Sequence, residues 1–79
     1  YHSTLFHMTL SEAVPTIVYR VKSINGTDTV RIMEMGLTPN SELEVIRKAP
    51  LGFPLEIRVR GYLLSLRKEE CDAIEVELV

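Results

Sequence analysis

Apolar and polar residues alternate along four stretches of the chain, which is the pattern of strands with one buried face. The four stretches are residues 17–24, 42–46, 55–60 and 74–78. A fifth stretch, residues 62–66, is almost continuously apolar, so we expect a strand with both faces at least partly covered. Five short strands favour closure, because a closed sheet has no exposed edges. The pattern therefore predicts a mainly β fold, a small five-stranded barrel.

One helix is expected between the first two strands, over residues 28–35. Thr27 offers a cap oxygen at its start, and Gly36 suits the left-handed conformation that often follows a helix end. The residues expected to share the inward face of this helix and to plug the barrel are Val30, Met33 and Leu37.

The remaining segments read as turns and short helical pieces. Thr9 and Glu12 have the spacing of a capping box for a single helical turn, and residues 67–73 fit another. Asn40 is expected to take a positive φ in a tight turn, and residues 49–54 form a loop. Ile46 interrupts the alternation of the strand that begins at residue 42, which predicts either a second apolar face or a bulge near Arg47 and Lys48.

Length and composition are those of one small globular domain. The chain has 79 residues, of which 46% are hydrophobic and 25% charged. We assign the domain to residues 9–79 and treat residues 1–8 as a leader or an expression remnant.

Charge and hydropathy exclude several classes of partner. The formal net charge is -2, so there is no basic field to attract nucleic acid. No apolar run approaches the roughly 20 residues of a membrane span, so direct membrane insertion is not expected. The single cysteine, Cys71, cannot form an intrachain disulfide, which fits a cytoplasmic protein.

Catalytic and nucleotide-binding motifs are missing from the predicted domain. No histidine follows His7, so neither a Ser/His/Asp nor a Cys/His arrangement is available. The sequence also lacks the Gly-x-x-x-x-Gly-Lys-Ser/Thr loop that holds phosphates. We therefore do not expect an enzyme.

Three ordered motifs carry a family resemblance over nearly the whole chain. They are Met-Glu-Met-Gly-Leu at residues 33–37, Ala-Pro-Leu-Gly-Phe-Pro at 49–54 and Arg-Gly-Tyr-Leu-Leu-Ser-Leu-Arg at 60–67. In these motifs the chain resembles the ferrous iron transport protein A family (FeoA). The resemblance implies an SH3-like barrel that acts as a cytosolic accessory or regulator of ferrous iron uptake. It would dock on the cytoplasmic part of the ferrous iron permease, ferrous iron transport protein B.

Direct binding of ferrous iron is an alternative, but the ligands are sparse. Besides carboxylates, the candidates are His2, His7 and Cys71, and both histidines lie in the leader. We predict no metal site and no cofactor, with Cys71 as a weak candidate that is better interpreted as a partly buried thiol.

The candidate docking residues come from three parts of the sequence. Leu51, Phe53 and Pro54 form an apolar loop, although Leu51 could instead cap the barrel end. The other candidates are Met33 and Leu37, which are better interpreted as core residues, and Arg58, which is better interpreted as pairing with glutamates across the sheet.

Other roles remain open from the sequence. An SH3-like domain of this kind also ends iron-dependent transcriptional repressors, and signalling barrels of similar shape bind proline-rich peptides in aromatic grooves. Strand edges could also pair between copies, so a homo-oligomer is possible.

Overall fold

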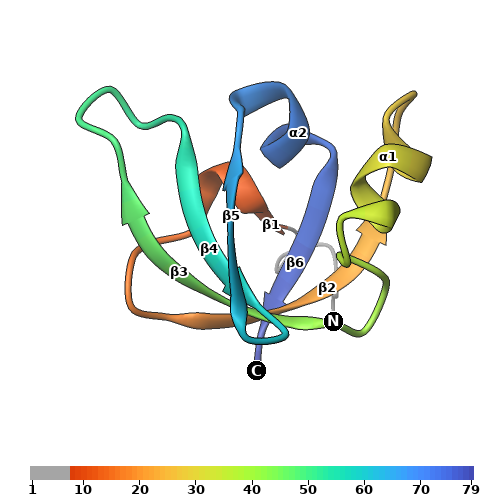
Figure 1. Cartoon of the computed structure of the whole chain (residues 1–79), viewed down its shortest axis with the longest axis horizontal. Helices are drawn as coiled ribbons and strands as arrows, with labels where there is room; N and C mark the ends of the chain where they lie inside the picture. The colour runs from red at the N-terminus through yellow and green to blue at the C-terminus, as the bar shows by residue number, and fades with distance from the viewer. Residues whose placement is uncertain (1–7) are drawn as a thin grey trace, which may run out of the picture.

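The computed structural model describes residues 8–79, which form one antiparallel sheet and three short helical segments (Figure 1). The sheet has six strands in the order β1-β6-β2-β3-β4-β5. The strands are β1 (Met8–Thr9), β2 (Val18–Ile24), β3 (Glu42–Lys48), β4 (Leu55–Val59), β5 (Tyr62–Leu66) and β6 (Ile74–Leu78). The helical segments are the 3-10 turn η2 (Leu10–Glu12) and the helices α1 (Thr29–Glu34) and α2 (Lys68–Asp72). Neither α-helix is long and apolar enough to cross a membrane.

The predicted fold class is confirmed, with two corrections. A sixth strand is present, because Met8 and Thr9 pair with Val76 and Glu75 of β6. Met8 was expected in the leader, and residues 1–7 of that leader lie outside the described part of the chain. The sheet is also not closed: within residues 8–79 its two edge strands, β1 and β5, do not pair with each other.

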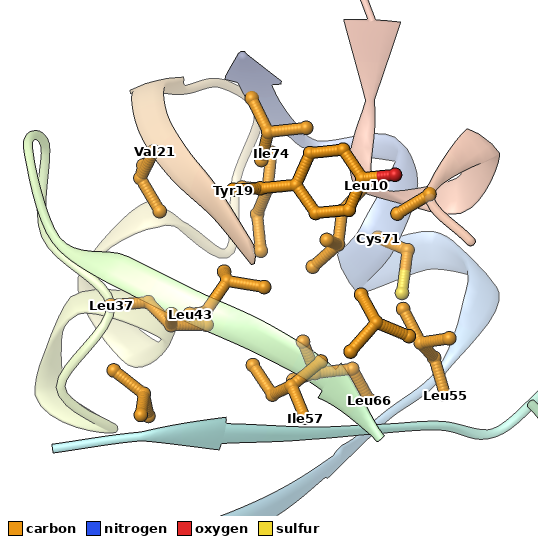
Figure 2. Packing of buried hydrophobic residues seen from close by; sticks show 14 of the residues in the cluster. Leu10, Tyr19, Val21, Leu37, Leu43, Leu55, Ile57, Leu66, Cys71 and Ile74 are labelled. Carbon is orange, nitrogen blue, oxygen red and sulfur yellow. The ribbon is translucent and has the colours of Figure 1, made fainter. Parts of the chain in front are cut away.

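The core lies inside the curved sheet and takes alternate residues from its strands (Figure 2). Leu55, Ile57 and Val59 of β4 are buried, whereas Arg58 between them is exposed. The expected bulge near Arg47 is confirmed by a register shift in the pairing of β3 with β4 between Val45 and Arg47. The other fully buried large side chains come from the longer strands, from η2 and α1, and from the segment after α1: Leu10, Val21, Ile32, Leu37, Leu43, Val45, Leu66, Ile74 and Val76.

Helix α1 turns a different face to the core from the one predicted. Ile32 is fully buried, whereas Val30 is 68% and Met33 39% exposed. The helix has six residues, and Asp28 rather than Thr27 is its N-cap. Such a short helix has fewer than two turns, so the spacing of its apolar residues does not select one face.

Strand β5 was expected to be at least partly covered on both faces. This holds for its inner face, where Leu64 is half-buried and Leu66 buried, but not for its outer face, where Leu63 and Ser65 are exposed. Tyr62 is 44% and Leu63 57% exposed, while Leu66 at the other end is buried. The reason is the position of β5 at the edge of the sheet, where β4 is its only partner among the described strands.

Two turns fix how β5 is placed. Arg60 was expected within the strand but has a φ of 53° and forms, with Gly61 at 85°, the two-residue turn of the β4–β5 hairpin. At the end of α1, Gly36 has a φ of 105°, and Asn40 in the following turn has a φ of 75°; both were predicted to be positive. The Tyr62 hydroxyl donates to the carbonyl oxygen of Met35 over 2.6 Å, which ties the start of β5 to this end of α1.

Glu70 joins the two α-helices. Its Oε1 accepts a hydrogen bond from the Arg67 backbone N–H at 2.8 Å, and its Oε2 lies 2.6 Å from Nη2 of Arg31. Burial, the largest single influence, raises the pKa of this carboxyl, but the bonds from Arg67 and Arg31 outweigh burial and hold the pKa below its ordinary value. Glu70 is therefore ionised at neutral pH and pairs α2 with α1.

Candidate functional site

The loop that joins β3 to β4, residues 49–54, is the candidate site and is called the β3–β4 loop below. Its turn is closed by a hydrogen bond of 2.7 Å from the Gly52 N–H to the Ala49 carbonyl oxygen. A second bond of 3.2 Å, from the Ala49 N–H to the Pro54 carbonyl oxygen, ties its two ends together. Pro50 fits the second position of this turn, and the φ of 98° at Gly52 suits glycine. The loop is a defined hairpin end.

Leu51 lies at the tip of this turn and is 94% exposed. The expectation that it caps the barrel end is therefore wrong, because the turn between Ala49 and Gly52 directs its third residue away from the sheet. Phe53 is half-buried and packs against the core instead. Covering a leucine side chain removes apolar surface from water and stabilises a complex by about 1.5–3 kcal/mol. Leu51 is thus a ready contact for an apolar partner surface.

A shallow groove of about 380 Å³ runs beside the loop. Its lining residues are Arg47, Lys48, Ala49, Pro50, Pro54 and Glu56. Across it, Nε of Arg47 lies 3.2 Å from Oε1 of Glu56, whereas Lys48 has no ion pair with any of residues 8–79. The groove is therefore apolar along its proline side, with one uncompensated positive charge.

The predicted docking residues do not gather on one surface. Leu51, Phe53 and Pro54 belong to the β3–β4 loop, but Met33 lies on α1, at the opposite end of the molecule in Figure 1. Leu37 is fully buried in the core, which removes it from any docking surface. Arg58 lies on the outer face of β4, where its Nη1 contacts Oε1 of Glu44 at 3.1 Å.

The groove residues were missed in the sequence. Arg47 and Lys48 were considered only as the place of a bulge, and Glu56 as part of the solvent face of the next strand. The bulge between Val45 and Arg47 was the available signal, because a bulge re-aims the side chains that follow it.

Cys71 is fully buried in the core, beside Leu10 and Leu55 in Figure 2. Burial, assisted by the negative charges of Glu70 and Asp72, raises the pKa of its thiol to about 12. Metal binding by cysteine needs the thiolate. Moreover, no group of three or more His, Cys, Asp or Glu residues within 8–79 is placed to hold a metal ion.

We expect the Cys71 thiol to be unreactive in the folded protein. A water-soluble disulfide reagent at mildly alkaline pH should leave it unmodified, while the chain unfolded in denaturant should react completely, because both the burial and the raised pKa are lost. The release of the reagent's chromophore measures the reaction. Rapid modification without denaturant would contradict the burial of Cys71.

Known proteins resemble this chain over most of its length. The model of the FeoA domain family matches residues 8–78. The chain is 38% identical over 63 residues to a Fe(2+) transport protein A/Fe(2+) transporter FeoB fusion protein from Porphyromonas gingivalis. That match covers 80% of the chain and 7% of the fusion protein. The chain therefore spans a small part of this relative.

Solved structures share the fold. Iron(II) transport protein A from Clostridium thermocellum is 38% identical, with a TM-score of 0.84 over 91% of the chain and 46% of that protein. FeoA from Stenotrophomonas maltophilia, solved with zinc and described as an SH3 domain protein, is 29% identical with a TM-score of 0.76, over 89% of each chain. A manganese-dependent transcriptional repressor is 18% identical with a TM-score of 0.82, over 92% of the chain and 37% of that protein, which shows a common fold alone.

Proposed function

Because the chain belongs to the FeoA domain family, we propose that it is a cytosolic accessory protein of ferrous iron uptake that docks on the cytoplasmic part of the ferrous iron permease. The observation that carries this proposal is the fusion protein of Porphyromonas gingivalis, whose name joins Fe(2+) transport protein A and the transporter FeoB in one chain. Fusion raises the effective concentration of one domain near another, so it favours pairs of domains that work together.

The β3–β4 loop is the surface that we assign to this docking. The apolar side chain of Leu51 is almost fully exposed to water in the free protein, so a partner surface can bury it. Pro50 stiffens the turn that carries Leu51. The groove adjoining the loop supplies Lys48 as a charge for an acidic group of the partner. An apolar anchor with a polar rim is the usual composition of a protein interface.

In this proposal the chain catalyses no reaction and regulates the permease by binding to it. An accessory that binds one conformation of the permease better than another shifts the permease toward that conformation, by as much as the two affinities differ. The role of a repressor domain rests on a common fold alone, so we do not propose it.

Uptake of radiolabelled ferrous iron by cells that lack the chain tests this function. We expect uptake to fall, to be restored by the wild-type chain, and to remain low with Leu51→Ser expressed at the same level. The matched control is Leu78→Ser, because Leu78 is 63% exposed and lies at the end of β6, outside the β3–β4 loop. Unchanged uptake without the chain would contradict the proposed function.

A further inference from the structure

Strand β5 leaves one edge of the sheet open. It pairs with β4 over its whole length, from Val59↔Tyr62 to Leu55↔Leu66, and it has no other strand partner among residues 8–79. In a two-residue hairpin the residues that flank the turn form a hydrogen-bonded pair, and such pairs then alternate along the ladder. Leu63 and Ser65 therefore turn their backbone N–H and C=O groups away from β4.

These outward groups are uncovered. Leu63 is 57% exposed and Ser65 is exposed, and neither takes part in any turn, loop, cap or side-chain hydrogen bond found among residues 8–79. The opposite edge differs, since β1 has only two residues. Strand β5 is thus the one long edge in the part of the sheet that the structure describes.

The usual protections of an edge strand are missing from β5. Its sequence, Tyr-Leu-Leu-Ser-Leu, has neither a charged residue nor a proline, whereas β2, β3, β4 and β6 each carry at least two charges. Natural edge strands commonly carry lysine, proline or a bulge to prevent pairing with other chains. An unprotected edge of this length is suited to the addition of a strand.

The charges at the two ends of β5 indicate what kind of strand is added. Arg60 precedes the strand and Arg67 follows it, both are exposed, and neither forms an ion pair with any of residues 8–79. Between them, Leu63 on one face and the half-buried Leu64 on the other offer apolar contact. A complementary strand is apolar in its centre and acidic at both ends.

We propose that β5 binds an extended segment of a partner protein by strand addition, with apolar residues beside Leu63 and Leu64 and carboxylates beside Arg60 and Arg67. The main-chain groups of Leu63 and Ser65 supply the hydrogen bonds, and the two arginines select the acidic ends. This surface is separate from the β3–β4 loop, so the inference holds whether or not the chain docks on the permease.

A second copy of the chain is the competing occupant, and the charges oppose it. Two β5 strands paired antiparallel about Leu64 would bring the turn that carries Arg60 in one copy close to Arg67 of the other copy, at both ends of the new ladder. Positive charges brought close together repel one another, which destabilises this pairing. The edge therefore favours an acidic partner over itself.

Titration with synthetic peptides, followed in the amide NMR spectrum of the labelled chain, tests the proposal. The probe is a short peptide of alternating valine and threonine with glutamates at both ends. We expect the amide signals of Leu63 and Ser65 to shift saturably. The same peptide with lysines at both ends should bind roughly tenfold more weakly, because each attractive ion pair at the surface becomes a repulsion. A glutamate-ended peptide N-methylated at every central residue should not bind, because it cannot form the ladder.

Two variants separate the edge from the rest of the surface. Leu63→Lys should abolish the shifts, since it places a charge in the edge, whereas Leu78→Lys, at an exposed leucine outside β5, should leave them unchanged. Arg67→Glu should reverse the preference between glutamate-ended and lysine-ended peptides. Three results would overturn the proposal: no shifts on β5, equal binding of the N-methylated peptide, or concentration-dependent shifts of Leu63 and Ser65 without peptide that accompany a doubled mass in sedimentation.

Discussion

Gly36→Ala is expected to lower the free energy of unfolding by about 2–3 kcal/mol and the Tm by roughly 10–20 °C. Gly36 has a φ of 105°, a backbone conformation that strains any residue with a Cβ. A Cβ at this position would also overlap the Tyr62 hydroxyl oxygen. Tyr62 would then have to move and lose its hydrogen bond to the Met35 carbonyl oxygen, so the substitution combines backbone strain with the loss of a contact between α1 and β5.

Gly52→Ala is the matched control, since Gly52 has a similar φ of 98° and a Cβ there would meet nothing within 4 Å. It should cost only the backbone strain, about 1–2 kcal/mol. In a Tyr62→Phe background, Gly36→Ala should cost about as much as Gly52→Ala, because the overlapping oxygen is gone. Chemical denaturation measures all four variants. An equal cost of Gly36→Ala with and without the Tyr62 hydroxyl would contradict the contact.

Leu51→Ser is expected to weaken binding to the cytoplasmic part of the ferrous iron permease by roughly 10- to 100-fold, which corresponds to the loss of one buried leucine side chain. Stability should be unchanged, because Leu51 is 94% exposed in the free protein. Isothermal titration calorimetry with the purified cytoplasmic part of the permease measures the affinity, and thermal unfolding measures the stability.

Phe53→Ala and Leu78→Ser complete this experiment. Phe53 packs against the core, so its replacement should lower the stability of the chain as well as loosen the loop that carries Leu51. Leu78→Ser removes another exposed leucine and should change neither quantity. Equal affinities for Leu51→Ser and the wild-type chain would remove the β3–β4 loop from the interface.

Periodicity and turn chemistry predicted most of the sheet. The alternation of residues 55–60 placed Leu55, Ile57 and Val59 in the core, and the structure confirms this. Gly36 and Asn40 were correctly expected at positive φ, because few other residues tolerate it. These features depend on neighbours in the sequence, which is why the sequence alone suffices for them.

Features that depend on distant neighbours were not predictable in this way. An apolar run such as Tyr-Leu-Leu-Ser-Leu reads the same in a covered strand and in an open edge, and only the pairing order of the sheet separates the two. Likewise, the residue identities in the β3–β4 loop did not decide whether Leu51 or Phe53 packs inward. The turn between Ala49 and Gly52 decides it.

Docking through the β3–β4 loop is tested most directly by an amide NMR titration of the labelled chain with the purified cytoplasmic part of the permease from the same source. A parallel titration uses ferrous iron alone under anaerobic conditions. We expect the permease to shift residues 49–54 and the neighbouring groove, and iron to shift nothing. Permease shifts that leave residues 49–54 unchanged, or saturable iron shifts around Cys71 without any response to the permease, would contradict the account.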